Sequence, residues 1–243
     1  MKLTVLGNNG TYPIKNGACS SFLLEADAIK ILIDMGNGSL AKLQNICDLS
    51  EINVIIISHL HFDHFADLFP FKYAVETKKA FGDNIGKVKL YIPKVPQWIY
   101  SEISSNDVFS IYYIQDGLTE IMNNIGLHFF KVNHSIDSYA VRVTYENKIF
   151  TYSSDSSFCD SLMHAADSAD LFLCESTLLS NMKHLPGIHM TAFEAGVLAK
   201  KAKVKKLLLT HLFDAESGED YIKEAKSSLD KVEVSQILKN YNI

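Results

Sequence analysis

Four side chains that can bind a metal fall within six residues of this chain, in the run His59-Leu60-His61-Phe62-Asp63-His64. Imidazole nitrogens and a carboxylate at this density suit zinc or a similar transition metal better than calcium, which prefers oxygen ligands. Structural zinc sites usually close with four ligands and often include cysteine, which this run lacks. The run therefore predicts a metal site that keeps a position open for water. The alternative is a solvated loop that happens to hold three histidines.

An apolar run, Ile52-Asn53-Val54-Ile55-Ile56-Ile57-Ser58, comes directly before these ligands. It is short and rich in β-branched residues, which indicates a strand buried on both faces. The residues from His64 to about Lys78 have helical periodicity instead. The apolar residues expected on one side of that helix are Phe65, Leu68, Phe69 and Tyr73. The candidate ligands therefore lie on a strand-to-helix loop.

The order of the ligands on this loop predicts two pairs. His59 and His61 are two residues apart, so they point the same way in an extended segment. Asp63 and His64 follow at the turn into the helix and must point elsewhere. One loop thus offers two ligand pairs, which is what a two-metal site needs.

The pattern H-x-H-x-D-H after a buried strand resembles the signature of the metallo-β-lactamase superfamily, which calls for a later histidine, an acidic residue and a last histidine. His134, Asp155 and His211 each follow an apolar run, and they occur in that order. The resemblance extends from Leu3 to about Leu212. It implies an α/β fold, a four-layer αββα sandwich of the metallo-β-lactamase type, with the metals at one edge where the strands end.

Three further segments are similar to the ribonuclease Z and phosphodiesterase branch of that superfamily: residues 7–15, residues 31–36 and residues 189–195. Two features depart from ribonuclease Z. Asn16-Gly17-Ala18 stands where an Arg-Asn pair would be expected to recognise the tRNA end. Only 21 positions separate His134 from Asp155, which leaves no room for the long arm that grips tRNA. The resemblance is thus to a member of this branch that lacks the tRNA-binding arm.

The resemblance also implies the metal ligands and the cofactor. The cofactor would be two divalent ions per chain, and we expect zinc, with manganese as the alternative. Asp155 would bridge the ions, because its two oxygens can each bind one of two cations about 3.5–4 Å apart. A water between such ions has a pKa that falls from 15.7 toward about 7, so it becomes a bridging hydroxide at neutral pH. Asp63 could accept the remaining proton of that water. The first ion would be held by His59, His61 and His134, and the second by Asp63, His64 and His211.

His189 distinguishes between the hydrolytic reactions that such a site can perform. A histidine just before a helix can hydrogen-bond a phosphoryl oxygen or protonate a leaving alcohol, and the helix start adds amide donors. Thr191 and Glu194 form a capping box, which predicts that this helix begins there. The alternative for His189 is a surface histidine in a loop containing Pro186 and Gly187. Glu175 either orients His189 or is an ordinary carboxylate at a strand end.

We therefore expect a binuclear metal-dependent hydrolase, a phosphodiesterase that acts on a small or single-stranded phosphodiester. A lactone or thioester hydrolase on the same metals is one alternative, and a tRNA 3′-processing endonuclease is another. A binding or regulatory protein that keeps the metals without turnover is a third, although the complete ligand set disfavours it.

Composition agrees with a single metallo-hydrolase domain over residues 1–243, since the ligands extend from position 59 to position 211. The hydrophobic content of 47% excludes a disordered chain. The net charge is −5 and no basic block stands out, so we expect a small-molecule or short nucleotide phosphodiester as substrate and no stable complex with a large nucleic acid. Four cysteines without C-x-x-C spacing and the absence of a signal peptide or membrane-spanning run predict a cytoplasmic protein.

The segment from Gln97 to Asn124 is the least similar to the family and holds several aromatic residues. It predicts core packing or a homodimer contact, with an aromatic lid over the substrate as the alternative. Along the chain, strands are expected near 3–6, 19–25, 28–34, 52–57, 88–92, 127–132, 139–145, 148–153, 170–174, 206–210 and 232–235. Helices are expected near 39–49, 64–80, 158–165, 191–203 and 217–229.

Overall fold

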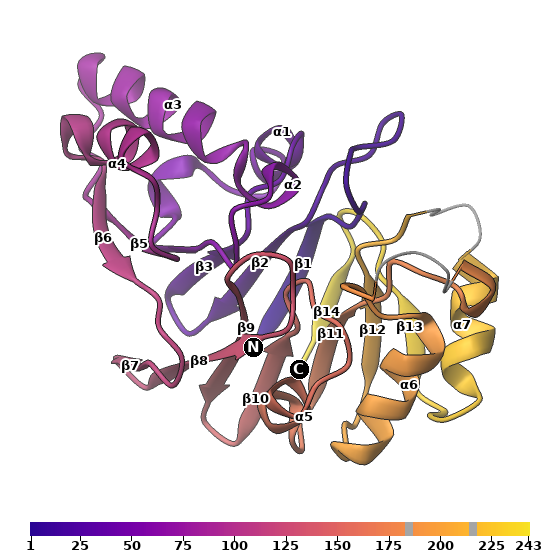
Figure 1. Cartoon of the computed structure of the whole chain (residues 1–243). Helices are drawn as coiled ribbons and strands as arrows, with labels where there is room; N and C mark the ends of the chain where they lie inside the picture. Colours follow the sequence, from indigo (N-terminus) through magenta and orange to yellow (C-terminus); the bar gives the residue numbers. More distant parts are fainter. Residues whose placement is uncertain (183–186, 214–217) are drawn as a thin grey trace.

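The apolar runs form strands, and in the computed structural model these strands build two sheets that face each other (Figure 1). The structure describes residues 1–182, 187–213 and 218–243, so Pro186 lies outside the described residues. Within these residues each sheet has seven strands. The first sheet runs in the order β14 (Asn240–Asn242), β1 (Lys2–Gly7), β2 (Ser21–Ala26), β3 (Ile29–Ile33), β4 (Val54–Ile56), β5 (Val88–Ile92) and β6 (Phe109–Tyr113). The second runs in the order β13 (Val232–Val234), β12 (Leu207–Thr210), β11 (Leu171–Glu175), β10 (Lys148–Tyr152), β9 (Ser138–Tyr145), β8 (Ile125–Val132) and β7 (Thr119–Met122).

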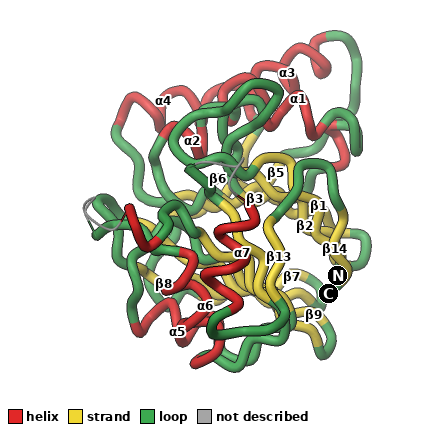
Figure 2. Tube along the Cα trace, turned by 90° about the vertical axis from the view of Figure 1, so that its right-hand side faces the viewer, coloured by secondary structure: helices red, strands yellow, loops and turns green. Residues whose placement is uncertain are grey.

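Helices cover the outer face of each sheet. In Figure 2 the strands lie between α1 and α3 at the top and α5 at the bottom. One layer contains α1 (Ser39–Leu43), α2 (Phe62–Phe65), α3 (Leu68–Ala80) and α4 (Gln97–Ser104), and the other contains α5 (Asp160–Ala166), α6 (Ala192–Lys201) and α7 (Gly218–Lys226). Single 3-10 turns occur at Leu49–Glu51, Ser105–Asp107 and Ser180–Met182. The expected four-layer αββα sandwich is confirmed.

Three apolar clusters hold these layers together. One fills the space between the sheets and includes Phe22, Phe129 and Phe150, all fully buried. The other two join each sheet to its helices, with Phe71 in the first helical layer and Phe172 beneath the second. Burying an aromatic or branched side chain contributes about 1.5–3 kcal/mol, so the sandwich provides a rigid frame for the loops at its edges.

The helix expected over 64–80 is two helices in the structure. It begins two residues earlier, at Phe62, and is interrupted between Phe65 and Leu68. The buried residues of α3 are Leu68, Phe71, Lys72 and Val75, so the prediction that Tyr73 lies on the same side as Leu68 is wrong. Tyr73 is 72% exposed, and Phe71 is buried in its place.

The aromatic segment 97–124 forms α4, β6 and β7 and carries the chain from the first sheet to the second. Phe109 is buried and stacks on Phe71, and Tyr112 stacks on the buried Tyr91. Trp98, Tyr100, Tyr112 and Tyr113 remain 40–55% exposed, so core packing applies to Phe109 and to part of Tyr112. Among the described residues, no helix has the length and apolar character needed to cross a bilayer.

Strand direction brings the candidate ligands to one edge. β10, β11 and β12 are parallel, and β8 shares their direction because β9 is antiparallel to both β8 and β10. The carboxyl ends of these four strands therefore lie together, as is usual where parallel strands build a site. The loop after β4 reaches the same edge from the first sheet.

Candidate metal centre

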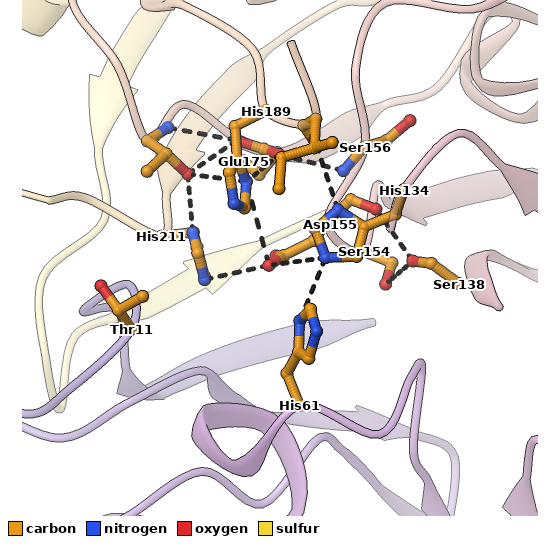
Figure 3. A network of polar contacts seen from close by, with 12 residues as sticks. Thr11, His61, His134, Ser138, Ser154, Asp155, Ser156, Glu175, His189 and His211 are labelled. Atoms are coloured by element: carbon orange, nitrogen blue, oxygen red, sulfur yellow. Dashed lines mark hydrogen bonds and ion pairs between the residues drawn. The ribbon is translucent and has the colours of Figure 1, made fainter. Parts of the chain in front are cut away.

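Residues from both sheets meet at this edge (Figure 3). Thr11 and His61 lie below the centre in that view and come from the first half of the chain. His134, Asp155 and His189 lie above it and come from loops that follow strands of the second sheet. The structure thus brings together side chains from the first and the second half of the chain, and all seven sequence-predicted ligands are among them.

The first group of candidate ligands is His59, His61, His134 and Asp155, whose ligand atoms all lie within 4.8 Å of one another. His59 Nε2 lies 3.6 Å from Asp155 Oδ2, and His134 Nε2 lies 3.1 Å from His61 Nδ1. Three imidazoles and a carboxylate at such distances form the donor set that zinc prefers.

The second group is Asp63, His64, Asp155 and His211, with the same 4.8 Å limit between ligand atoms. His211 Nε2 lies 3.1 Å from Asp63 Oδ2 and 3.2 Å from Asp155 Oδ2. Asp155 belongs to both groups, and its other oxygen, Oδ1, lies 3.3 Å from His64 Nε2. One fully enclosed carboxylate is therefore shared by two adjacent donor sets.

A second partner fixes the orientation of most of the imidazoles. His64 Nδ1 lies 2.8 Å from Asp34 Oδ2, and His134 Nδ1 donates to the carbonyl of Ile188 at 3.1 Å. His211 Nδ1 lies 2.7 Å from Thr177 Oγ1. In each case the Nδ1 contact leaves Nε2 free to face the centre, which is the usual way that proteins orient metal-binding histidines.

The donor atoms themselves indicate that the site fits cations. His59 Nε2, His64 Nε2 and Asp155 Oδ1 are buried, and none has a hydrogen-bond partner among the described residues. His64 Nε2 and Asp155 Oδ1 are near each other but are not aligned for a hydrogen bond. A buried polar atom without a partner costs about 1–3 kcal/mol. A cation that accepts these lone pairs removes that cost, so the residues present fit a metal centre.

The electrostatics of the first group favour the protonation state that binds metal. Burial and the neighbouring His64 hold the pKa of His59 well below its usual value. Burial likewise lowers the pKa of His61 and of His134. Burial opposes ionisation of Asp155, yet His211 and the other imidazoles hold its pKa well below the usual range. Neutral imidazoles and an ionised carboxylate are the forms that bind a divalent cation.

His64 differs from the other histidines. Burial opposes its charged form, but Asp155 and Asp34 on either side raise its pKa well above the usual value. The negative surroundings that hold a proton on this ring would also attract a divalent cation, which displaces the proton when it binds.

Four residues other than glycine at the site have a left-handed backbone: Thr11 (φ 63°), Asp34 (φ 57°), Ser154 (φ 55°) and His211 (φ 56°). Such conformations cost on the order of 1–3 kcal/mol for non-glycine residues and cluster at functional sites. The packed sheets stabilise these strained backbone conformations. The conformations of His211 and Ser154 direct the side chains of His211 and of Asp155, the residue after Ser154, toward the same point.

His189 lies directly beside the two donor groups. Its Nδ1 is 2.8 Å from Glu175 Oε1 and 3.9 Å from Asp155 Oδ2, and its ring stacks on His211 with centroids 5.4 Å apart. Burial disfavours the charged ring, but the Glu175 carboxylate raises the pKa of His189 to about 9. Because Nδ1 faces Glu175, Nε2 is the nitrogen left to meet a substrate.

Glu175 is fully buried and receives several hydrogen bonds besides its contact with His189. Ser156 N donates to Oε1 at 2.9 Å, and Thr177 Oγ1 donates to Oε2 at 2.9 Å. Thr177 therefore links this carboxylate to His211. The result is a rigid carboxylate that connects His189 to a candidate ligand.

The helix start after His189 is organised differently from our expectation. The capping box of Thr191 and Glu194 is present, so the predicted beginning of α6 is confirmed. However, Glu194 N donates to Thr191 Oγ1 and Ala192 N donates to the Leu178 carbonyl. The Glu194 carboxylate accepts from Thr191 N. Because these internal partners occupy the amide donors that a phosphate would need, His189, and not the start of the helix, is the group offered to a substrate.

Sequence reasoning did not assign roles to Asp34, Thr177 and Thr11. Thr11 N donates to Asp63 Oδ2 at 2.8 Å and so holds a candidate ligand from outside. Asp34 and Thr11 lie in the segments 31–36 and 7–15 that are similar to the ribonuclease Z branch, but the similarity suggested no role for either residue. Thr177 carried no signal, because His211 is 34 residues away in the sequence.

Comparison with known proteins gives a consistent result. Residues 30–212 match the family described as the β-lactamase superfamily domain. The probable metallo-hydrolase YhfI of Bacillus subtilis (strain 168) is 30% identical over 233 residues, which cover 93% of each chain. The crystal structure of YhfI superimposes with a TM-score of 0.92, at 27% identity, over 99% of this chain and 98% of that one.

Two ribonuclease Z proteins are also similar. That of Clostridium acetobutylicum is 25% identical and covers 96% of this chain and 95% of its own length. Its alignment has 302 positions, at least 59 more than the 243 residues of this chain. The structure of the short form of human tRNase Z (ELAC1) has a TM-score of 0.81 at 20% identity, over 100% of this chain and 99% of that one. At this identity the likeness concerns the fold alone.

Proposed function

The chain belongs to the β-lactamase superfamily and is a metal-dependent hydrolase, and from this premise we propose that it is a two-metal phosphodiesterase for small phosphodiesters. The observation that carries the proposal is the Glu175–His189 pair beside the donor groups. Cleavage of a phosphodiester expels an alkoxide, which needs a proton. Lactone opening also expels an alkoxide, but a lactone is uncharged, whereas a phosphodiester brings a negative charge that a protonated His189 can balance as well as donating the proton.

We assign His59, His61 and His134 to one cation, Asp63, His64 and His211 to the other, and Asp155 to both. The support is the shared carboxylate and the unpartnered donor atoms that face the centre. Zinc is the ion we expect, with manganese as the alternative, because the donors are imidazoles and carboxylates. When bound, two such cations stabilise charge on phosphoryl oxygens and lower the pKa of a water between them from 15.7 to about 7.

His189 is the proposed proton donor. Its pKa of about 9 keeps the ring protonated at neutral pH in the protein alone, and Glu175 holds Nδ1 so that Nε2–H can point to the leaving oxygen. As the bond from phosphorus to that oxygen breaks, Nε2 gives its proton to the alkoxide and Glu175 stabilises the ring in its correct orientation.

Asp63 is better suited to holding a cation than to accepting a proton. Burial raises its pKa, but the hydrogen bond to His211 and the charges nearby lower the pKa of Asp63 by more. A carboxylate with so low a pKa is a weak base, and Thr11 N further stabilises its ionised form. Proton acceptance from the attacking water is therefore its secondary role in this proposal.

The charge distribution supports a small substrate. Arg142 is the one arginine of the chain, and it donates to the carbonyls of Ala165 and Asp167 at the end of α5. It is thus committed to structure and does not offer the bidentate phosphate contact typical of arginine in nucleic-acid sites. The shorter chain relative to ribonuclease Z fits the same proposal.

The test is a substrate panel with the zinc-loaded protein: bis-nitrophenyl phosphate, cyclic nucleotides, a short RNA and a lactone. We expect turnover of the phosphodiesters and little turnover of the lactone. Preferential lactone cleavage would instead support the alternative hydrolase. Precursor tRNA is assayed in parallel, and efficient cutting at its 3′ end would contradict our interpretation of the missing arm.

We also propose that the reaction takes place in the cytoplasm. The four cysteines form no disulfide, and Cys19 and Cys174 are buried as free thiols, which suits a reducing compartment.

A further inference from the structure

A third set of possible metal ligands lies beside the two donor groups. It consists of Glu175, His189 and His211, whose ligand atoms also lie within 4.8 Å of one another (Figure 3). No buried side-chain N or O atom of this set lacks a partner among the described residues, in contrast to His59 Nε2 and Asp155 Oδ1. The set therefore differs from the two donor groups, because hydrogen bonds already join its members.

The hydroxyl of Thr177 lies in the middle of this set. Thr177 is 5% exposed, and its Oγ1 lies 2.9 Å from Glu175 Oε2 and 2.7 Å from His211 Nδ1. The same oxygen is 3.3 Å from His189 Nδ1, which lies closer, at 2.8 Å, to Glu175 Oε1. One hydroxyl thus contacts both the carboxylate that holds His189 and a candidate ligand of the second cation.

The direction of these hydrogen bonds follows from the chemistry of the groups. A carboxylate can only accept, so the single O–H of Thr177 donates to Glu175 Oε2. The Thr177 oxygen can then only accept from His211, which places the proton of that ring on Nδ1. Nε2 of His211 keeps its lone pair and lies 3.1 Å from Asp63 Oδ2. Through Thr177, the Glu175 carboxylate therefore selects the tautomer of His211 that can bind a cation.

We propose that Thr177 is a positioning residue whose hydroxyl couples cation binding at His211 to the orientation of the proton donor His189. A network of hydrogen bonds, not a third ion, joins these residues. The inference rests on the proposed function, which it deepens by linking the metal centre to the proton donor. When His211 Nε2 binds a cation, its Nδ1–H donates more strongly to Thr177, and hydrogen bonds in such a chain strengthen one another. Glu175 is then held more firmly, and with it the ring of His189.

Zinc binding tests the first step of this coupling. Thr177→Val keeps the shape of the side chain and removes the hydroxyl. In competition with a fluorescent chelator it should weaken one of the two ions by on the order of 10- to 100-fold, the usual effect of removing such a partner. The other ion should keep its affinity, because His59, His61 and His134 are not among the described partners of this hydroxyl. Thr177→Ser should restore the wild-type affinity. Equal weakening of both ions, or of neither, would overturn the proposal.

The control variant is Thr151→Val. Thr151 is fully buried in β10 of the same sheet, and its Oγ1 donates to the carbonyl of Ala165 at 3.0 Å. The substitution therefore removes a buried threonine hydroxyl whose partner belongs to α5. Both ions should keep their affinity. If Thr151→Val weakens an ion as much as Thr177→Val does, general destabilisation is the cause and the proposal fails.

The number of ions tests whether the third set is a network or a metal site. The wild type should bind two zinc ions per chain tightly, because hydrogen bonds already pair the facing atoms of Glu175, His189 and His211. A third ion of similar affinity that is lost in both His189→Ala and Glu175→Gln would overturn the proposal, since these side chains would then be ligands.

A double-mutant cycle tests the second step of the coupling. At saturating zinc, Thr177→Val should lower kcat for a dinucleotide by on the order of 10-fold, a part of what a positioned proton donor contributes. Added to His189→Ala, it should have little further effect, because the hydroxyl acts through that ring. Losses that multiply would mean that Thr177 and His189 act independently, which would overturn the coupling.

Binding of inorganic phosphate separates this inference from the proposed function. If no phosphodiester is hydrolysed, the phosphodiesterase assignment fails, and calorimetry with phosphate on the zinc-loaded protein still tests the coupling. Thr177→Val should weaken phosphate binding by on the order of 10-fold when His189 is present, and it should have no further effect in His189→Ala. Equal weakening in both backgrounds, or none in either, would overturn the inference.

Discussion

Asp34 Oδ2 lies 2.8 Å from His64 Nδ1, and both side chains are fully buried. The same oxygen accepts a hydrogen bond from the Tyr152 hydroxyl at 2.9 Å, and Asp34 Oδ1 accepts one from Ser58 N at 2.7 Å. Asp34 follows β3 of the first sheet, whereas Tyr152 ends β10 of the second. One carboxylate therefore joins a candidate metal ligand to both halves of the sandwich.

Replacing this carboxylate should weaken metal binding without removing a ligand. In Asp34→Asn the side chain keeps its shape but no longer presents a carboxylate to His64. Such partners typically contribute 10- to 100-fold to metal affinity, and we expect a loss of about that size in competition with a fluorescent chelator. Tyr152→Phe is the control, because it removes a hydrogen bond to Asp34 and leaves the contact with His64. Equal zinc affinity in Asp34→Asn and the wild type would contradict the role.

The shared carboxylate leads to a prediction about stoichiometry. The purified protein should contain two divalent ions per chain by elemental analysis. Asp155→Ala should lose both ions and all activity, because Asp155 belongs to both donor groups. A chelator should lower the Tm of the wild type through the loss of bound ligand, and it should leave the Tm of Asp155→Ala unchanged. No bound transition metal, and no activity regained on adding one, would refute the two-metal assignment.

Local patterns predicted a metal loop after a buried strand and a mixed α and β chain, whereas the layered fold and the two donor groups were predicted from the resemblance to the metallo-β-lactamase superfamily. His59, His61, Asp63 and His64 follow a short β-branched run, and strands impose the direction of the loop that follows. His134, Asp155 and His211 could be proposed because the family pattern calls for such residues in that order, and each follows an apolar run of its own. Helix α6 could be predicted from Thr191 and Glu194, since a capping box depends only on residues three apart.

Features that depend on distant contacts could not be predicted. At the break after Phe65 the Met35 backbone replaces helical partners, since Met35 N donates to the His64 carbonyl and the Met35 carbonyl accepts from Asp67 N. Met35 is about 30 residues away in sequence, so local periodicity could not show this contact. The edge strand β6 is stabilised by pairing with β5 and by ring contacts such as that of Tyr112 with Tyr91. Its short sequence alone therefore gave little indication of a strand. Pairings such as Asp34 with Tyr152, 118 residues apart, exist only once both sheets have formed.

Gly36 provides a test of how closely the metal loop is packed. A Cβ at this position would lie 2.0 Å from the carbonyl oxygen of Asp63, so Gly36→Ala must displace the loop that carries Asp63 and His64. We expect a loss of about 1–3 kcal/mol in the free energy of unfolding, together with reduced zinc content. Gly86→Ala is the matched control, because a methyl group there would have no described atom within 4 Å beyond its chain neighbours. Full zinc content and unchanged stability in Gly36→Ala would contradict the close packing.

His189 is the residue that separates chemistry from metal binding. His189→Ala should keep the fold and both metals, because the two donor groups are complete without it. It should lower kcat by on the order of 10²–10⁴, the usual contribution of a positioned proton donor. Glu175→Gln should give a smaller loss in kcat with the metals retained, since it removes the partner that orients His189 and raises its pKa.

The size of the His189→Ala effect should depend on the leaving group. An acidic phenol leaves without a proton, so the loss should be small for bis-nitrophenyl phosphate and large for a dinucleotide, which expels a sugar alkoxide. A uniform loss across leaving groups would indicate a contact with a phosphoryl oxygen instead. Loss of a metal from His189→Ala would make His189 a ligand and change the assignment of the centre. Unchanged rates for every phosphodiester would remove the main support for a phosphodiesterase, and lactone or thioester hydrolysis would become the better hypothesis.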